Sequence, residues 1–212
     1  MSTLYTLTAY EKIKQLIIST KLPPGSAIDE KSLIKQLNIG RTPIHTALNR
    51  LALEQLVETI PRRGTFVTGI DIMDLPKLFE FRTILEIAVV GLAVDRATND
   101  QIINMEKVLH LFSISDAVLD NQSFIEMDKQ FHMLIYDAAN NKHIKETLEI
   151  LYAQIERIWC YFSVNNLDEF RATGINHRDI LLAIKDRDKA KAEALMADHT
   201  IWLQERIVAI FK

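Results

Sequence analysis

Cysteine is almost absent from this chain, because Cys160 is the only one among 212 residues. A single cysteine cannot form a disulfide within the chain, so packing and polar contacts have to hold the fold together. Low cysteine content is typical of proteins in a reducing compartment. We therefore expect a cytoplasmic protein.

Long hydrophobic runs are also missing. The longest mostly apolar stretch, residues 84–94, is too short to cross a bilayer and contains Glu86. The opening residues, MSTLYTLTAYEK, lack a basic segment followed by an apolar one, so we expect neither a signal peptide nor a membrane partner. Hydrophobic residues nevertheless make up 48% of the chain, which is enough to bury the core of one or two domains.

Glycine and proline are scarce, with six and five residues, so few positions force regular structure to end. Apolar residues at helical spacing predict a helix at 8–20 and a second one that Asp29 caps. A third helix should run to about Glu54, with Thr42 as its N-cap and Pro43 in its first position. After residue 71, the same spacing predicts six helices, at roughly 72–96, 99–116, 121–139, 142–165, 168–185 and 188–211.

Alternating residues interrupt the helical pattern once. LVETI and TFVTG read as two short strands, and PRRG between them predicts a hairpin with a basic tip. Three helices followed by a hairpin are typical of a winged helix-turn-helix. The predicted fold is therefore mainly α, with a winged helix-turn-helix DNA-binding domain at 1–70 and an all-helical, six-helix domain at 71–212.

Charge is distributed unevenly between these two parts. Residues 1–68 contain nine Lys or Arg and five Asp or Glu, which leaves 16 basic and 23 acidic residues in the remainder of the chain. A basic segment joined to an acidic one indicates a nucleic-acid-binding module attached to a domain with another task.

The stretch NIGRTPIHTALNRL supplies the polar residues that such a module needs. The second helix of a helix-turn-helix enters the major groove with its N-terminal residues towards the bases. Arg41 stands at that end, and its fork suits guanine O6 and N7. The glycine and the two arginines of PRRG would let the hairpin enter the minor groove. The predicted DNA-binding residues are Lys31, Arg41, Thr42, His45, Asn49, Arg50, Arg62, Arg63 and Gly64.

Residues 22–67, LPPGSAIDEKSLIKQLNIGRTPIHTALNRLALEQLVETIPRRGTFV, resemble the N-terminal domain of the GntR family of bacterial transcription regulators. The resemblance implies a homodimer that binds double-stranded DNA at a palindromic operator. Two positions depart from the family pattern: His45 stands where the family usually has arginine, and Gln55 where it usually has glycine. The first departure bears on base reading, and the second on the turn before the first strand.

Polar residues recur on apolar helix faces in the acidic part of the chain. Asp128 and His132 are four residues apart and share one face, while His177 and His199 align with apolar residues on two further helices. A buried polar group without a partner costs about 1–3 kcal/mol, so we expect these side chains to meet. One carboxylate and three imidazoles suit a divalent transition metal such as zinc, nickel, manganese or iron.

Three segments resemble the FCD ligand-binding domain of the FadR branch of GntR regulators, in its VanR-like subgroup; they are LFEFRTILEIAVVGLA, DKQFHMLIYDAANN and HRDILLAIKDRDKAKAEALMADH. The resemblance spans about 72–205 and places the metal ligands at Asp128, His132, His177 and His199. The family commonly has Glu where this chain has Asn176.

The FCD resemblance also implies that a small carboxylate effector binds at the metal, with nearby Arg or Asn side chains. The predicted effector-binding residues are Arg82, Asn141 and Arg157. Arg82 could instead, or in addition, form an i, i+4 ion pair with Glu86.

The leading hypothesis is a metabolite-responsive transcription regulator, which we expect to be a repressor and not an enzyme. A metal-dependent, hydrolase-like enzyme is one alternative, since a metal with open positions can activate water. A regulator whose metal is purely structural is another. The predicted helix at 72–96 carries the residues expected to contribute to the dimer, namely Ala88, Val89, Leu92 and Ala93.

Overall fold

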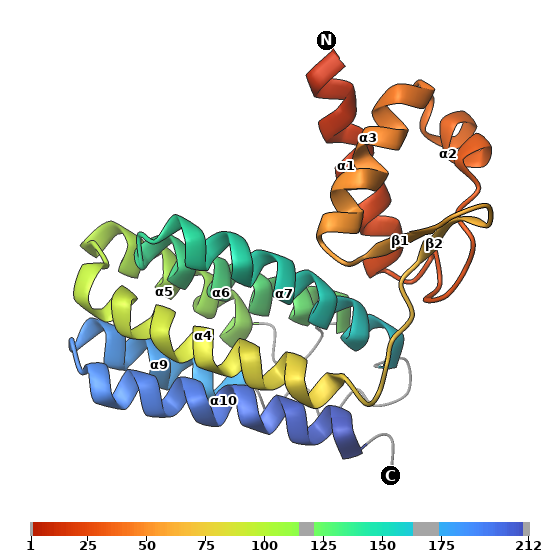
Figure 1. The fold of residues 1–212 in the computed structure, drawn as a ribbon. Coiled ribbons are helices and arrows are strands. Elements are labelled where there is room, and N and C mark those ends of the chain that lie inside the picture. Colours follow the sequence, from red (N-terminus) through yellow and green to blue (C-terminus); the bar gives the residue numbers. More distant parts are fainter. Residues whose placement is uncertain (1, 115–120, 163–173, 210–212) are drawn as a thin grey trace. The chain divides into compact units, whose positions relative to one another are not determined.

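The computed structural model describes residues 2–114, 121–162 and 174–209, which form a mainly helical fold with one small sheet (Figure 1). The chain divides into two compact units, Met1–Asp71 with Ala153–Tyr161, and Ile72–Tyr152 with Phe162–Lys212. The elements are α1 (Ser2–Ile18), α2 (Glu30–Leu37), α3 (Arg41–Leu53), β1 (Val57–Ile60), β2 (Gly64–Val67), α4 (Leu75–Arg96), α5 (Asn99–Ile114), α6 (Asn121–Ala138), α7 (Lys142–Phe162), α9 (Gly174–Lys185) and α10 (Lys189–Ala209). None of the described helices is long and apolar enough to cross a membrane.

The first unit is built on the packing of α1 against α3. Its core includes Ile13 and Ile17 from α1 and Ile44 and Leu51 from α3, all with no exposed surface. Asp29 caps α2 as predicted, since its carboxylate accepts a hydrogen bond of 2.9 Å from the backbone N–H of Lys31.

The prediction that Thr42 caps α3 is wrong. The helix begins at Arg41, and Gly40 is the extended residue before it. The carbonyl of Gly40 already accepts the first helical bond, from the N–H of Ile44 at 3.3 Å, so Thr42 lies inside the first turn. Pro43 is then the third helical residue, where its missing N–H still costs nothing.

The wing is a two-stranded antiparallel hairpin, as predicted. Its register pairs Val57 with Val67 and ends where Ile60 pairs with Gly64. Arg62 (φ 65°) and Gly64 (φ 106°) have left-handed backbone conformations in the connection. The tight turn therefore places the basic side chains of Arg62 and Arg63 at the hairpin tip, exposed to solvent.

Gln55, which links α3 to β1, is strained in a way that glycine would relieve. Its φ is 59°, a left-handed conformation that costs a residue with a side chain about 1–2 kcal/mol. Glycine avoids this cost but loses about 0.5–1 kcal/mol through its greater freedom in the unfolded chain. We therefore expect Gln55→Gly to stabilise the protein by up to about 1 kcal/mol, measured as a higher urea midpoint. Gln36→Gly, in α2, is the control and should destabilise by about 1 kcal/mol. A lower midpoint for Gln55→Gly would show that the turn is unstrained.

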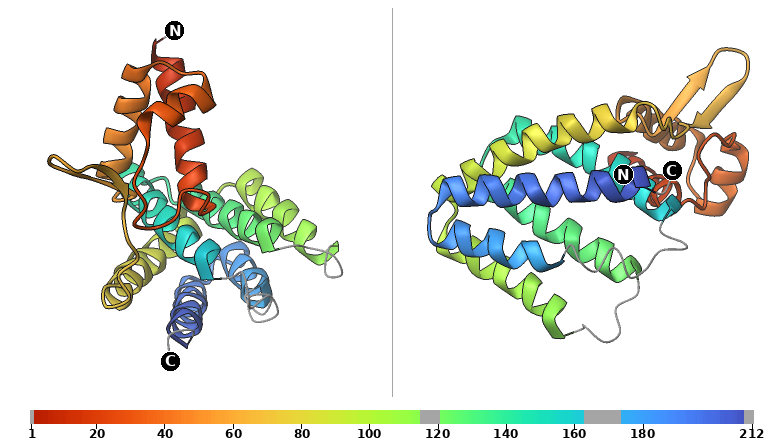
Figure 2. Two further views of the ribbon diagram at one scale, coloured as in Figure 1. Left: turned by 90° about the vertical axis from the view of Figure 1, so that its right-hand side faces the viewer. Right: turned by 90° about the horizontal axis from the view of Figure 1, so that it is seen from below.

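Six helices contribute to the described part of the second unit, although residues 153–161 of α7 belong to the first unit. They agree with the six predicted ranges to within a few residues where both are described; positions 115–116, 163–165, 168–173 and 210–211 of the prediction lie outside the described residues. Helix α10 packs along α4 and α9, and α6 packs against α4 and α5 (Figure 2). The core of this unit contains Val90, Phe131, Ile135 and Leu148, among others.

Two residues predicted to lie in a dimer interface belong to this core instead. Val89 and Ala93 have no exposed surface, because the face of α4 that carries them packs inside the unit. That part of the prediction is wrong, whereas Ala88 is exposed and Leu92 is half-buried. Gly91 lies on the side of α4 that approaches α10, where an added Cβ would clash with the carboxylate of Glu193.

Candidate metal centre and DNA-binding surface

Three helices bring the four predicted metal ligands together inside the second unit. Asp128 and His132 come from α6, His177 from α9 and His199 from α10. Their candidate ligand atoms all lie within 4.8 Å of one another. All four side chains are buried, and the most exposed of them, His199, has only 2% exposure. Helical spacing placed the first pair on one face, and the packing of α9 and α10 adds the other two.

The distances between these atoms fit a shared metal ion. From Asp128 Oδ1, the Nε2 atoms lie at 3.0 Å for His177, 3.8 Å for His132 and 4.0 Å for His199. The Nε2 atoms of His132 and His199 are 3.2 Å apart. An ion about 2.0–2.2 Å from each ligand would hold neighbouring ligand atoms about 3 Å apart. In addition, Asp128 Oδ1 is fully buried, and the three imidazoles of the cluster surround it. The residues present therefore fit a divalent ion.

Glu86 of α4 forms a second layer around the cluster. Its Oε2 lies 3.2 Å from His132 Nδ1, and its Oε1 accepts hydrogen bonds from Tyr136 Oη at 2.5 Å and Arg82 Nε at 3.1 Å. A carboxylate on one ring nitrogen of a histidine holds the proton there and leaves the other nitrogen for a metal. Glu86 thus aims His132 Nε2 into the cluster, and Tyr152 similarly holds Asp128 by donating to Oδ2 at 2.5 Å.

The protonation states of the cluster suit metal binding. Burial alone would raise the pKa of Glu86, but His132, Arg82 and the Tyr136 hydroxyl lower it to about 2. Burial opposes ionisation of Asp128 as well, yet the surrounding imidazoles hold its pKa well below the usual range. Burial and the neighbouring imidazoles lower the pKa of His199. Ionised carboxylates and a neutral imidazole are the forms that bind metals.

Arg82 brings a positive charge beside this cluster. Its side chain is 1% exposed and forms the predicted i, i+4 pair with Glu86 through Nε. The two terminal amino groups of Arg82 are buried without a hydrogen-bond partner among the described residues. Its guanidinium carbon lies 5.5 Å from the centre of the Tyr152 ring. The arrangement leaves a buried fork of two N–H₂ groups that could receive an anion.

The structure does not bring the other two predicted effector residues to the cluster. The Oδ1 of Asn141 accepts a hydrogen bond of 3.3 Å from the N–H of Ile144 at the start of α7. Arg157 belongs to the first unit, where its guanidinium donates to the Thr68 carbonyl at 2.9 Å. The side chain of Asn176 lies outside the described residues.

Sequence reasoning missed three residues of the site: Glu86 as the group that orients His132, together with Tyr136 and Tyr152. Tyr136 had a signal, because it follows His132 by four residues on the same helix face. Glu86 was noticed only as a partner of Arg82. No pattern in the sequence indicated Tyr152, because it contacts Asp128 from a different helix, α7.

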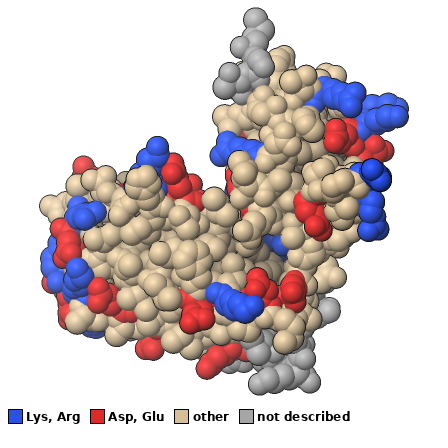
Figure 3. All heavy atoms as spheres, viewed as in Figure 1, with Lys and Arg blue, Asp and Glu red and all other residues tan. Residues whose placement is uncertain are grey.

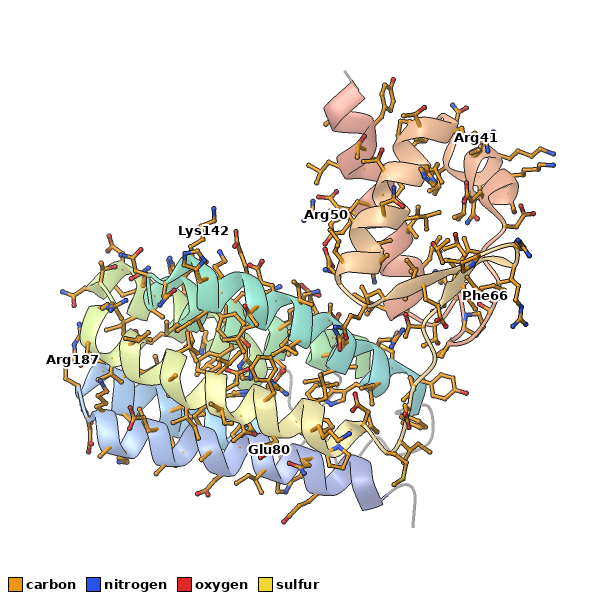
Figure 4. All side chains as sticks on the ribbon, viewed as in Figure 1. Arg41, Arg50, Phe66, Glu80, Lys142 and Arg187 are labelled. Atoms are coloured by element: carbon orange, nitrogen blue, oxygen red, sulfur yellow. The ribbon has the colours of Figure 1, made fainter. Side chains whose placement is uncertain are left out.

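Basic and polar residues gather on an exposed surface of the first unit. Figure 3 shows Lys and Arg side chains over α2 and the hairpin, and Figure 4 shows Arg41 at the start of α3. Helix α3 turns its apolar face inward and leaves the opposite face in solvent. The exposed candidates on this surface are Lys31, Arg41, Thr42, His45, Asn49, Arg62, Arg63 and Gly64.

Arg50 lies on a different face from these residues. Nine residues separate it from Arg41, which is about half a turn around the helix axis. Its guanidinium carbon lies 3.7 Å from the centre of the Tyr10 ring, and its Nε lies 3.4 Å from Glu54 Oε1. Glu54 also accepts a bond of 2.7 Å from Lys14. These contacts hold Arg50 against α1, away from the surface around Arg41.

Comparison with known proteins matches known families to two parts of the chain. The FCD domain family matches residues 77–201, and the family described as bacterial regulatory proteins, gntR family, matches residues 5–67. The chain belongs to the GntR family and carries an FCD domain. The gntR match contains the exposed surface just described, and the FCD match contains all four residues of the metal cluster.

Individual relatives agree with the family assignment. The HTH-type transcriptional repressor RspR of Escherichia coli K12 is 27% identical over 198 residues, which cover 93% of this chain and 86% of RspR. The fold of E. coli McbR/YncC is similar, with a TM-score of 0.85 at 24% identity over 98% of this chain and 97% of that one. A solved metal-free FCD domain covers 68% of this chain and 97% of its own, with a TM-score of 0.56 at 15% identity. These matches are regulators and not enzymes, which removes the support for the metalloenzyme alternative.

Proposed function

We propose that this protein is a metabolite-responsive repressor in which a divalent metal ion and a small carboxylate together control DNA binding. The observation that carries the proposal is the buried set Asp128, His132, His177 and His199 beside the fork of Arg82, whose amino groups have no described partner. A GntR domain supplies DNA binding, and an FCD domain implies a small-molecule effector.

Four protein ligands leave room for an effector at the metal. Their nitrogen and oxygen donors suit zinc, nickel, manganese or iron. An ion with octahedral geometry would keep two positions for other ligands, and a carboxylate can take one or both. When bound, the ion supplies positive charge and coordination to that carboxylate, while Glu86 and Tyr152 keep His132 and Asp128 in place.

The charges of the buried residues favour an effector that presents one negative charge. Asp128 and Glu86 are ionised, and Arg82 carries one positive charge. With neutral imidazoles, a divalent ion brings the whole buried set to a net charge of about +1. Uncompensated buried charge is costly. A single carboxylate on the metal and Arg82 would neutralise the set and satisfy the guanidinium fork.

DNA binding would use a symmetric dimer on a palindromic operator. Exposed apolar residues on α4, namely Phe81 (46%) and Ile84 (59%) with Ala88, form a stripe that a second copy could cover. Arg41 would read a base, and Arg62 and Arg63 would enter the minor groove. His45 would contact a different base from the one that the family's usual arginine contacts at this position. The effector can change DNA binding only by binding one arrangement of the dimer more tightly than another.

Arg82→Gln should weaken carboxylate binding without removing the metal. Losing a charged fork costs about 1.5–3 kcal/mol, so a roughly tenfold or greater rise in the midpoint carboxylate concentration is expected. The readout is the thermal shift of metal-loaded protein with acetate and a panel of small organic acids, alongside metal content. Arg82→Lys keeps the charge facing Glu86 and controls for loss of that ion pair, and Arg178→Gln, an exposed arginine of α9, controls for net charge.

Two results would count against this effector site. Equal carboxylate response in wild type and Arg82→Gln would remove Arg82 from it. A carboxylate shift that persists in correctly folded, metal-free protein would favour a purely structural metal.

A further inference from the structure

Arg157 is a buried cation that forms no ion pair with any of the described residues. Its side chain lies in the first unit, and the residue is 4% exposed. Arg82, which is also buried, forms an ion pair with Glu86. Among the residues that the structure describes, Arg157 forms no ion pair, and its hydrogen bond is the one to the carbonyl oxygen of Thr68, at 2.9 Å.

This arrangement leaves positive charge uncompensated inside the protein. Burial lowers the pKa of Arg157 to about 10, and no carboxylate counteracts that effect. Arginine therefore remains charged at neutral pH. A backbone carbonyl offers only a partial negative charge, so the desolvation of the guanidinium is incompletely offset.

Unused hydrogen-bond donors accompany the charge. The Nε of Arg157 and the hydroxyl Oγ1 of Thr68 are both buried without a hydrogen-bond partner in the described structure. Thr68 directly follows β2, and its N–H donates to the Leu56 carbonyl at 3.1 Å, which ties it to the base of the wing. Both residues belong to the first compact unit, whereas the Asp128 cluster belongs to the second.

We propose that Arg157 and Thr68 form a second anion-binding site, separate from the metal centre, for the carboxylate or phosphate group of a small molecule. The guanidinium supplies charge and the Nε–H donor, and the threonine hydroxyl supplies a further donor. Oxyanions accept charge-assisted hydrogen bonds from such groups. The ligand would contact the DNA-binding unit directly, at the base of its wing.

The test follows the Nε–H resonance of Arg157 in the full-length protein as purified, labelled with 15N-arginine. The resonance is assigned by its absence from the spectrum of the Arg157→Gln variant. Inorganic phosphate and acetate are titrated separately, each against chloride at matched ionic strength. A saturable shift with either anion is expected, and the anion that produces it identifies the preferred group.

Variants separate this site from the metal centre. Thr68→Val keeps the shape of the side chain, removes the hydroxyl and should weaken binding about tenfold. Arg82→Gln, at the other site, should leave this binding unchanged. Failure of the metal-centre proposal would not affect this titration.

Two outcomes would overturn the second site. One is a resonance that moves no more with phosphate or acetate than with chloride. The other is a resonance that already has a bound-like shift without added anion and loses it on dilution to monomer, because a carboxylate of a second copy would then be the counter-charge.

Discussion

Protein carrying both His132→Ala and His177→Ala is expected to be purified without a metal ion. The double variant removes two of four ligands that come from two helices, α6 and α9, and leaves Asp128 buried without two of its three imidazole neighbours. Removing the partners of a buried charge costs about 3–5 kcal/mol. We therefore expect a lower melting temperature as well as the loss of metal, measured by elemental analysis and thermal unfolding.

A matched control is available for this loss. His143→Ala removes an exposed histidine at the start of α7 and should leave metal content and melting temperature unchanged. Circular dichroism separates loss of metal from loss of fold, because the double variant should keep its helical spectrum at low temperature. Full metal occupancy in the folded double variant would refute the proposed ligand set.

Arg41→Ala is expected to abolish specific operator binding. A bidentate contact to guanine is worth about 1–3 kcal/mol of discrimination, and a symmetric dimer would lose it at both half-sites. Non-specific binding depends on the total phosphate contacts and should fall only slightly. The measurement is a fluorescence anisotropy titration of operator and scrambled DNA at the same salt concentration.

Arg50→Ala is the matched control for Arg41→Ala, because both variants remove an arginine from α3. The side chain of Arg50 lies on Tyr10 and Glu54, so its loss should affect stability more than base reading. Unchanged operator affinity in Arg41→Ala would remove Arg41 from the interface. Equal loss of specificity in Arg50→Ala would mean that the face holding Arg50 contacts DNA.

The sequence predicted features that depend on local spacing. Asp29 caps α2, and Asp128 and His132 share one helix face because residues four apart are neighbours on any helix. The hairpin follows from alternation and a turn that needs left-handed residues. Even the convergence of His177 and His199 was accessible, since each stands among apolar residues that have to face the core.

Features that depend on how helices pack could not be predicted from the sequence. An apolar residue on α4 suits either a core or a dimer face, and only packing decides that Val89 is fully buried. Glu86 orients His132 from another helix, and spacing along one helix cannot reveal such a contact. The same limit explains Arg157, whose neighbour in the first unit, Thr68, is far away in sequence.

Recovery of DNA from the sheared genome of the host would show whether this protein reads a specific operator. Metal-loaded wild-type protein is incubated with the fragments at moderate salt, and the retained fragments are sequenced beside those that Arg41→Ala retains. We expect a short palindrome that is enriched with the wild type and absent with the variant, near genes that point to the effector. If folded wild-type protein retains nothing beyond the Arg41→Ala background, both with and without the organic acids that shift its melting temperature, it is not a sequence-specific DNA-binding regulator.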